Sequence, residues 1–285
     1  MKFTIVIATS QRRTDWLINR SLTSVYRQIG IDKSEWNLFV VDDNENESEF
    51  FEIKKRIELL RNNLHLNYTE FPTTVLKNTR TRYMSGTGAW NTGIFYVKNF
   101  DNWKNSFIAI LDDDDEWLPE YLQTCKNAVK ESENIIAVFC QLIWRTNETD
   151  EIHDLTIEKL TQENFYIGNP GVQGSNTFIN SQIFNELNGF DEAFPNSNDR
   201  ELMIRLLDYI ESENNKLKNK LECKVIEIPL VIHYNHNDIK VNNNFQSKKV
   251  ALDLFYKRYK NRFSEIAFEK SITRAKKYFH YDYEE

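Results

Sequence analysis

The chain has 285 residues, a formal net charge of -7 and a hydrophobic content of 40%. This hydrophobic content is enough to build a core, so the composition excludes a largely disordered protein. The excess of acidic residues argues against a general nucleic-acid binder, which needs a positive face for phosphates. Three cysteines lie far apart with no Cys-x-x-Cys pair, which argues against a disulfide scaffold or a zinc ribbon and favours a reducing compartment.

The first half of the chain alternates short apolar runs with amphipathic segments. Buried strands are predicted at residues 3–8 and 36–41, and helices at residues 15–28 and 50–62. A third strand is predicted at residues 64–71. Strand, helix, strand, helix is the opening of a parallel α/β sheet with right-handed crossovers.

After residue 79 a polar loop leads into a helix near residues 91–97, and a fourth strand at residues 107–111 follows. A helix at residues 120–130 and a strand at residues 135–144 continue the pattern. The first apolar run is too short for a secretory signal, and no apolar stretch approaches the roughly 18 residues of a membrane span. We therefore expect a cytoplasmic protein.

The strongest chemical signal is the run of four carboxylates from Asp112 to Asp115, directly after the fourth predicted strand. In an open α/β sheet, ligands bind beyond the carboxyl ends of the strands. Aspartates at i and i+2 can reach one hard divalent cation, and Mg²⁺ commonly shares carboxylate and phosphate oxygens. The alternative is a solvated acidic turn that caps the next helix. The position directly after a buried strand favours the metal site.

Two weaker signals indicate a bound nucleotide. Asp42 and Asp43 end the second predicted strand, where a carboxylate could accept hydrogen bonds from a base or a ribose; an ordinary turn is the alternative. Arg80 and Arg82 lie in the polar loop, and the planar guanidinium matches phosphate. Two solvated surface arginines are the alternative there.

Two further segments contain candidate catalytic or metal-binding groups. Asp199 stands at the start of an amphipathic helix, where it could be a general base or, with Asn198, a plain helix cap. His233 and His236 follow a strand-like segment at residues 226–232. Either could supply an imidazole to a metal, and we favour His236.

Taken in this order, the motifs resemble the family 2 glycosyltransferases, whose GT-A fold is an α/β fold with a mostly parallel central sheet flanked by helices. The resemblance runs from Phe3 to about Asp238, most of the chain. The segments that carry it are residues 5–12, 21–28, 40–44, 88–94, 111–119, 189–192 and 199–205. Seven such segments in the right order are a much stronger signal than any single acidic motif.

The resemblance implies a nucleoside diphosphate sugar as the donor, with UDP as the usual nucleotide of the family. It places Thr9, Asp42 and Asp43 where the base and the ribose are held. Arg80 or Arg82 lies where the family has a basic contact to the nucleotide.

The resemblance also implies a divalent cation, Mn²⁺ or Mg²⁺. Asp112 and Asp114 match the outer residues of the family's Asp-x-Asp motif. Asp114 would bind the metal at the diphosphate. Asp112 would contact the metal, a water bound to it, or the ribose. Asp113 would contact the nucleotide. Asp115 could replace one of them, because the register within four aspartates is ambiguous. His236 is the remaining candidate metal ligand.

Asp199 matches the family's catalytic base. The implied reaction is an inverting single displacement in which an acceptor hydroxyl attacks the anomeric carbon. The acceptor could be a glycan, a lipid-linked saccharide or another hydroxyl compound. The implied division gives residues 1–240 to the transferase domain, with residues 1–120 holding the nucleotide and residues 121–240 supplying the acceptor surface. Residues 241–285 form a C-terminal helical extension.

Two other functions fit parts of the pattern. A nucleotidyltransferase also pairs a nucleotide with a carboxylate-bound metal, but it commonly has a glycine-rich loop after the first strand, and residues 8–13 contain no glycine. A non-catalytic metal- or carbohydrate-binding module would be indicated by loss of Asp114 or Asp199, and both are present.

The tail at residues 250–283 is basic and aromatic. It could dock on an anionic membrane surface, which would place the protein at the inner face of the membrane. The alternative is a helical segment that packs on the domain with its charges in solvent. We favour packing, because the chain as a whole is acidic.

Overall fold

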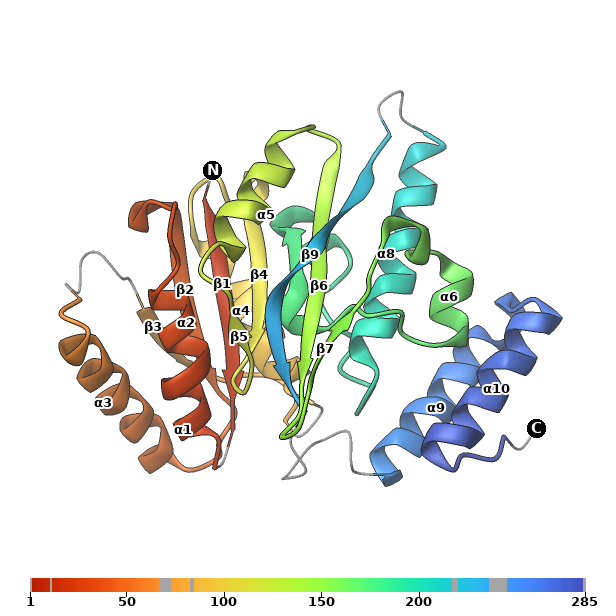
Figure 1. Ribbon diagram of the computed structural model, residues 1–285, viewed down its shortest axis with the longest axis horizontal. Helices are drawn as coiled ribbons and strands as arrows, with labels where there is room; N and C mark the ends of the chain where they lie inside the picture. Colours follow the sequence, from red (N-terminus) through yellow and green to blue (C-terminus); the bar gives the residue numbers. More distant parts are fainter. Residues whose placement is uncertain are drawn as a thin grey trace.

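The computed structural model describes residues 2–10, 12–66, 73–82, 85–216, 220–235 and 245–283. Within these ranges the centre is a nine-stranded sheet in the order β3-β2-β1-β4-β8-β6-β9-β5, with β7 paired to β6 (Figure 1). The strands are β1 Phe3–Thr9, β2 Trp36–Asp42, β3 Thr73–Lys77, β4 Phe107–Asp112, β5 Glu116–Trp117, β6 Ile135–Arg145, β7 Asp150–His153, β8 Thr177–Asn180 and β9 Glu222–Tyr234.

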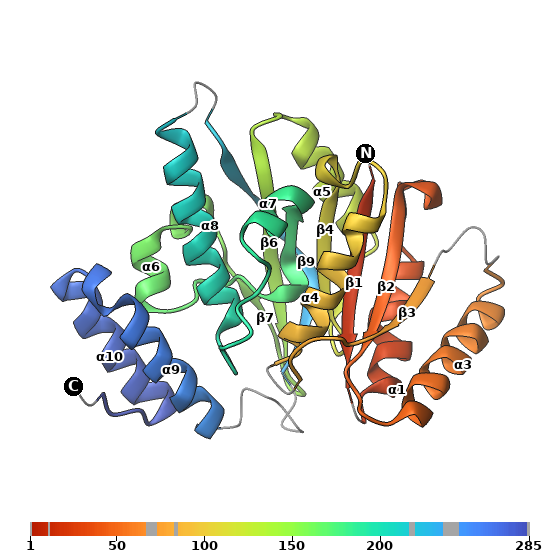
Figure 2. The same cartoon turned by 180° about the vertical axis from the view of Figure 1, so that it is seen from behind.

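Helices flank this sheet on both faces, and α9 and α10 lie beyond its end opposite α3 (Figure 1). The α-helices are α1 Thr14–Trp16, α2 Thr23–Tyr26, α3 Glu47–Asn63, α4 Thr87–Tyr96, α5 Tyr121–Lys130, α6 Gln162–Ile167, α7 Ser181–Glu186, α8 Asn198–Asn214, α9 Phe245–Tyr259 and α10 Glu265–Phe279. Helix α5 lies on the near face of the sheet in Figure 1, and α4 and α7 lie on the opposite face (Figure 2). The expected α/β architecture is confirmed.

The first four strands of the sheet are parallel, and the rest of the sheet is mixed. β1 pairs in parallel with β2 and β4, and β2 pairs in parallel with β3. β8 then runs antiparallel to both β4 and β6, while β9 is parallel to β6. The parallel part therefore brings the carboxyl ends of β1, β2 and β4 to one edge.

Alternating side chains of the central strands feed two separate cores. Val6 of β1 packs with Trp90 of α4 on one face. Ile5 and Ile7 pack with Tyr121 of α5 on the other face. A strand buried on both faces reads as a continuous apolar run, which is why residues 3–8 are recognisable in the sequence.

Most predicted elements form, with two differences. The third strand of the structure is Thr73–Lys77; of the strand predicted at residues 64–71, residues 67–71 lie outside the described residues. Leu64 and His65 form a turn because α3 continues to Asn63. The predicted helix at residues 15–28 is interrupted by a π-helical stretch, Leu17–Leu22, between α1 and α2.

The two C-terminal helices pack on the domain at the end of the molecule opposite α3 (Figure 1). Leu252, Phe255 and Tyr256 of α9 are buried, as is Ala275 of α10. The tail therefore has an apolar face that packs against the domain. None of the described helices is long and apolar enough to cross a membrane.

Candidate active site

The candidate site lies at the edge of the sheet where β1, β2 and β4 end, the lower edge in Figure 1. In the strand register, Thr9 stands opposite Asp42, and Ala8 stands opposite Asp112. Buried apolar residues fix these strands, and their first polar side chains therefore emerge next to one another. The register thus brings Asp42 of β2 and Asp112 of β4 to the same edge of the sheet.

Asp42 and Asp43 have different surroundings although they are adjacent. The fully buried carboxylate of Asp42 forms an ion pair with Lys77 Nζ at 2.9 Å and accepts from the backbone N–H of Asn44 at 3.0 Å. Asp43 Oδ1 accepts from Asn78 Nδ2 at 2.5 Å. The partners of Asp42 belong to its own turn and to the neighbouring strand, so its carboxylate stabilises the ends of β2 and β3.

The two candidate arginines point to different places. Arg82 donates from Nη1 to the backbone carbonyl of Asp43 at 2.9 Å, so it lies beside the expected nucleotide-binding residues. Arg80 instead pairs with Glu192 through Nε and lies 4.8 Å from the centre of the Phe95 ring. The structure therefore brings Arg82, and not Arg80, to Asp43.

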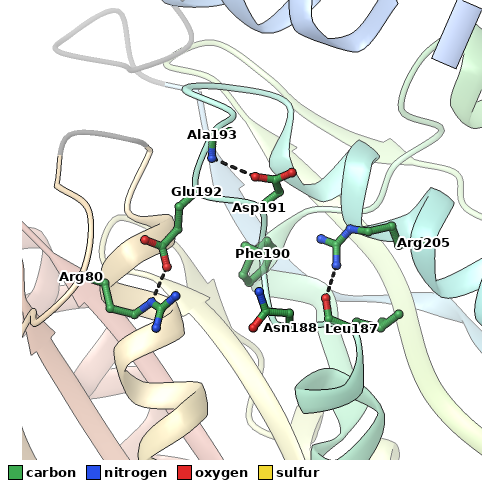
Figure 3. Close-up of a pocket in the computed structure, with 8 residues that line it drawn as sticks. All are labelled: Arg80, Leu187, Asn188, Phe190, Asp191, Glu192, Ala193 and Arg205. Atoms are coloured by element: carbon green, nitrogen blue, oxygen red, sulfur yellow. Dashed lines mark hydrogen bonds and ion pairs between the residues drawn. The ribbon is translucent and has the colours of Figure 1, made fainter. Parts of the chain in front are cut away.

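Arg80 and Glu192 line a pocket of about 360 Å³ that also includes Asp191 and Arg205 (Figure 3). Arg205 donates to the carbonyl oxygens of Leu187 and Gly189 and pairs with Glu201. The charged groups of this pocket thus have protein partners.

The three aspartates that follow β4 pair with two different side chains, Arg13 and His233. Arg13 donates from Nη1 to Asp113 Oδ1 at 2.7 Å and from Nη2 to Asp114 Oδ2 at 2.9 Å. Asp115 is fully buried, and its Oδ2 lies 2.9 Å from His233 Nδ1. Asp115 therefore has a different partner from Asp113 and Asp114, which both contact Arg13.

Asp112 lies where several carboxylates converge. Its Oδ2 accepts from Ser175 Oγ at 3.3 Å, and the same hydroxyl donates to Asp115 Oδ2 at 2.5 Å. Burial raises the pKa of Asp112 well above its usual range, and the charges of Asp115, Asp114 and Asp199 raise it further. Burial also raises the pKa of Asp113 to about 7, against the opposing charge of Arg13. A cation at this edge would relieve the repulsion.

The donor set fits a hard divalent cation that shares ligands with a nucleotide. Carboxylate oxygens suit Mn²⁺ and Mg²⁺, and Mg²⁺ sites commonly use only one or two carboxylates together with phosphate oxygens. Within the described part of the chain, no group of three or more His, Cys, Asp or Glu side chains is arranged to hold a metal. The protein alone therefore offers a partial ligand set, with Asp112 and Asp114 as the available carboxylates.

Asp199 stands in the first turn of α8, close enough to Asp112 for its charge to act on that carboxyl group. It is half-buried, and its Oδ1 has no hydrogen-bond partner among the described residues. Burial raises its pKa to about 7, although the charges of His233 and Lys248 oppose the shift. The influence of Asp199 on the pKa of Asp112 places both carboxylates in one electrostatic environment.

Of the two candidate metal-binding histidines, the structure describes only His233. His236 lies outside the described residues. His233 is buried, pairs with Asp115 and lies 4.7 Å from the Trp144 ring, centroid to centroid. Its Nδ1 therefore holds the interior aspartate in place.

Three residues of the site have no place in the sequence-based prediction: Arg13, Ser175 and Lys248. Arg13 follows β1 closely, and a basic residue there next to an acidic run is a signal that could have found it. Ser175 lies at the end of the glycine-containing segment 168–174. Lys248 is one of many lysines in the tail, and no local pattern distinguishes it.

Comparisons with known proteins identify the family and the fold. The model of Glycosyl transferase family 2 matches residues 4–187. TarS 1–349 from S. aureus, solved with UDP-GlcNAc, superimposes with a TM-score of 0.64 at 13% identity, covering 98% of this chain and 73% of that one. The mannosyltransferase PcManGT from Pyrobaculum calidifontis, solved with GDP-Man and Mn²⁺, gives 0.59 at 15% identity, covering 98% and 70%. No curated protein sequence matches.

The likeness to these solved structures identifies the fold as that of the GT-A glycosyltransferases. The family match extends from β1 to the end of α7, so it includes all four aspartates and the nucleotide-side residues. The chain is a transferase enzyme, and it belongs to glycosyl transferase family 2.

Proposed function

We propose that the protein transfers a sugar from a nucleoside diphosphate sugar to an acceptor hydroxyl with inversion at the anomeric carbon, and that Asp199 is the general base. The observation that carries this proposal is the carboxylate of Asp199. It is half-buried, its Oδ1 has no hydrogen-bond partner in the part of the chain that the structure describes, and it lies in the electrostatic environment of Asp112. Its pKa of about 7 suits proton abstraction at neutral pH.

In the proposed reaction, Asp199 takes the proton of the acceptor hydroxyl as that oxygen attacks the anomeric carbon. The bond between the anomeric carbon and the phosphate oxygen breaks, and the electron pair leaves with the nucleoside diphosphate. Thr9, Asp43 and Arg82 hold the nucleotide side of the donor. Asp42, Arg80 and Asp113 are further candidates there, and each forms an ion pair with a protein side chain in the structure.

Asp112 and Asp114 would hold Mn²⁺ or Mg²⁺, which supplies positive charge to offset the charge of the departing diphosphate. In the structure, Arg13 contacts Oδ2 of Asp114. If Arg13 released this carboxylate, Oδ2 of Asp114 would become available to the metal. Arg13 would then be available to the phosphates.

The donor nucleotide that we propose is UDP, with GDP as the alternative. TarS was solved with UDP-GlcNAc and UDP, and PcManGT with GDP-Man. The acceptor that we propose is a hydroxyl of a glycan or of a lipid-linked saccharide.

Donor turnover tests the proposal. Purified protein with Mn²⁺ is incubated with UDP-GlcNAc, UDP-glucose, UDP-galactose and GDP-mannose, and released nucleoside diphosphate is measured, with water as the acceptor if no other is known. Asp199→Asn should lower turnover by about 10²- to 10⁴-fold, the usual contribution of a general base, while UDP binding is retained. Glu211→Gln, an exposed acid on the same helix, is the matched control.

Wild-type turnover in Asp199→Asn would overturn the base assignment. Pyrophosphate release from a nucleoside triphosphate and a sugar phosphate would instead identify a nucleotidyltransferase. The anomeric configuration of the product, followed by NMR, tests inversion separately.

A further inference from the structure

The first turns of α9 reach the segment that presents Asp199. Lys248 Nζ donates to Asn196 Oδ1 at 2.8 Å and to Ser197 Oγ at 2.8 Å. These two residues directly precede α8, and Asp199 is the second residue of that helix. A residue 49 positions further along the chain thus contacts the turn that begins the helix of the proposed base.

The turn has an unusual backbone conformation. Ser197 is the N-cap of α8 with φ 64° and ψ 27°, in the left-handed region. Such a conformation is unfavourable for a non-glycine residue, so surrounding contacts must maintain it. A serine at this position commonly accepts a hydrogen bond from the helix backbone, but Ser197 makes no side-chain capping bond. Its hydroxyl accepts from Lys248 instead.

Lys248 lies among more positive than negative groups, so ion pairing alone does not stabilise it at this position. It is half-buried, and burial together with the charges of Arg200 on α8 and Arg274 on α10 lowers its pKa to about 7. Asp199 is the opposing negative group, and the Phe279 ring lies 4.4 Å from Nζ. The like charges of these two arginines make the position unfavourable for a lysine, and its hydrogen bonds to the turn can offset this cost.

The helix start is also held from its other side. Arg200 is buried and donates to the carbonyl oxygens of Phe165 and Tyr166 on α6, and its guanidinium lies 3.6 Å from the centre of the Phe255 ring. The residue after Asp199 is therefore fixed on α6 and α9. Lys248 holds the turn that precedes the helix, through its bonds to Asn196 and Ser197.

We propose that Lys248 is a positioning residue of the glycosyl transfer reaction: it fixes the turn at Asn196 and Ser197 so that the carboxylate of Asp199 faces the donor site. This inference rests on the proposed role of Asp199 as the base. It makes the C-terminal helices part of the catalytic machinery, because α9 provides the contact.

The test compares Lys248→Met, Lys248→Arg and Lys249→Met in the full chain. Lys249 is the exposed neighbour of Lys248 on α9 and has no place in the site, so its variant is the matched control. We measure turnover of the donor panel with Mn²⁺, UDP binding by calorimetry, thermal unfolding, and amide hydrogen exchange of the peptide that covers residues 194–203.

Lys248→Met should lower kcat by about 10- to 100-fold, as small misplacements of catalytic groups do, with UDP affinity and the melting temperature unchanged. Exchange at residues 194–203 should become faster. Lys248→Arg, which can still donate to both oxygens, should recover most of kcat, and Lys249→Met should equal wild type.

Wild-type kcat in Lys248→Met, or unchanged exchange at residues 194–203, would overturn the inference. A parallel loss of UDP affinity and melting temperature would also overturn it, because the role would then be general stability. Asp199→Asn, measured alongside, separates this inference from the proposed function. If that variant keeps its turnover, the base assignment fails, and hydrogen exchange alone then decides whether Lys248 holds the turn.

Discussion

The carboxyl group of Asp199 changes its protonation near neutral pH because it is buried. Only the deprotonated form can accept a proton from the acceptor hydroxyl. We therefore expect kcat to fall as the pH drops through about 7, and to reach a plateau above it. The measurement is kcat against pH from about 5 to 9, the window in which a base of this kind titrates. A flat profile in this range would contradict the assignment.

The same shift predicts an effect on stability. The pKa of Asp199 is about 7 in the folded protein and has its ordinary value of 3.8 in the unfolded chain, so between these two pH values the unfolded chain binds fewer protons. The contribution of Asp199 to the free energy of unfolding must then decrease as the pH rises from 3.8 through about 7. Relative to Asp199→Asn, which does not titrate, wild type should lose stability over this range in denaturant titrations. A constant difference would contradict the burial of this carboxyl group.

The sequence predicted which kinds of residue form the site, but not how they pair. Asp112, Asp43 and Asp199 are recognisable because each follows or begins an element with a clear apolar pattern. The division of the acidic run between Arg13 and His233 is not recognisable, because their partners come from distant parts of the chain. Adjacent aspartates look equivalent in a sequence and become distinct only through such tertiary contacts.

At the scale of elements, α4 and the loop before it approach each other so closely that only glycine fits. A Cβ on Gly88 would lie 1.9 Å from the carbonyl oxygen of Thr81. Gly88→Ala should therefore shift the loop and cost about 1–3 kcal/mol of stability, as overpacking does. Because the loop carries Arg82, the substitution should also weaken UDP binding. Denaturant unfolding and calorimetry measure the two effects.

The control for this variant is Asn99→Ala, an exposed position just after α4. It should leave both stability and UDP binding unchanged, within about 0.5 kcal/mol for a surface site. Gly88→Ala with wild-type stability would show that the loop moves freely, and that α4 does not fix the position of Arg82.

The sequence identified most of the elements and missed one irregularity that matters for the site. Buried strands such as β1 and β4 are continuous apolar runs, and their edges were predicted to within a residue. The π-helical stretch Leu17–Leu22 was predicted as an ordinary helix. In it, Arg20 and Ser21 donate to the carbonyl oxygens of Asp114 and Asp112. Helical periodicity cannot reveal a widened turn that depends on tertiary hydrogen bonds.

At the scale of the molecule, the C-terminal helices share a core with the rest of the domain. Phe255 of α9 is fully buried, and it belongs to one hydrophobic cluster with Phe165 of α6 and Leu202 of α8. We therefore expect one cooperative unfolding transition in calorimetry. Phe255→Ala should lower the free energy of unfolding by about 3–5 kcal/mol.

Tyr278→Ala is the control on α10, because this side chain is 55% exposed. Its effect should stay within about 0.5 kcal/mol. Two separate transitions in wild type, or an equally small effect of Phe255→Ala, would contradict a shared core. The helices would then be an independent extension of the domain.

The most direct measurement of the central claim is isothermal titration of UDP, GDP, CDP and dTDP, each with and without Mn²⁺, into wild type and Asp114→Ala. The account predicts that one diphosphate, which we expect to be UDP, binds in a metal-dependent way and that Asp114→Ala loses this binding. The absence of binding by any of the four nucleotides, with or without Mn²⁺, would contradict the proposed nucleotide-sugar-dependent transfer.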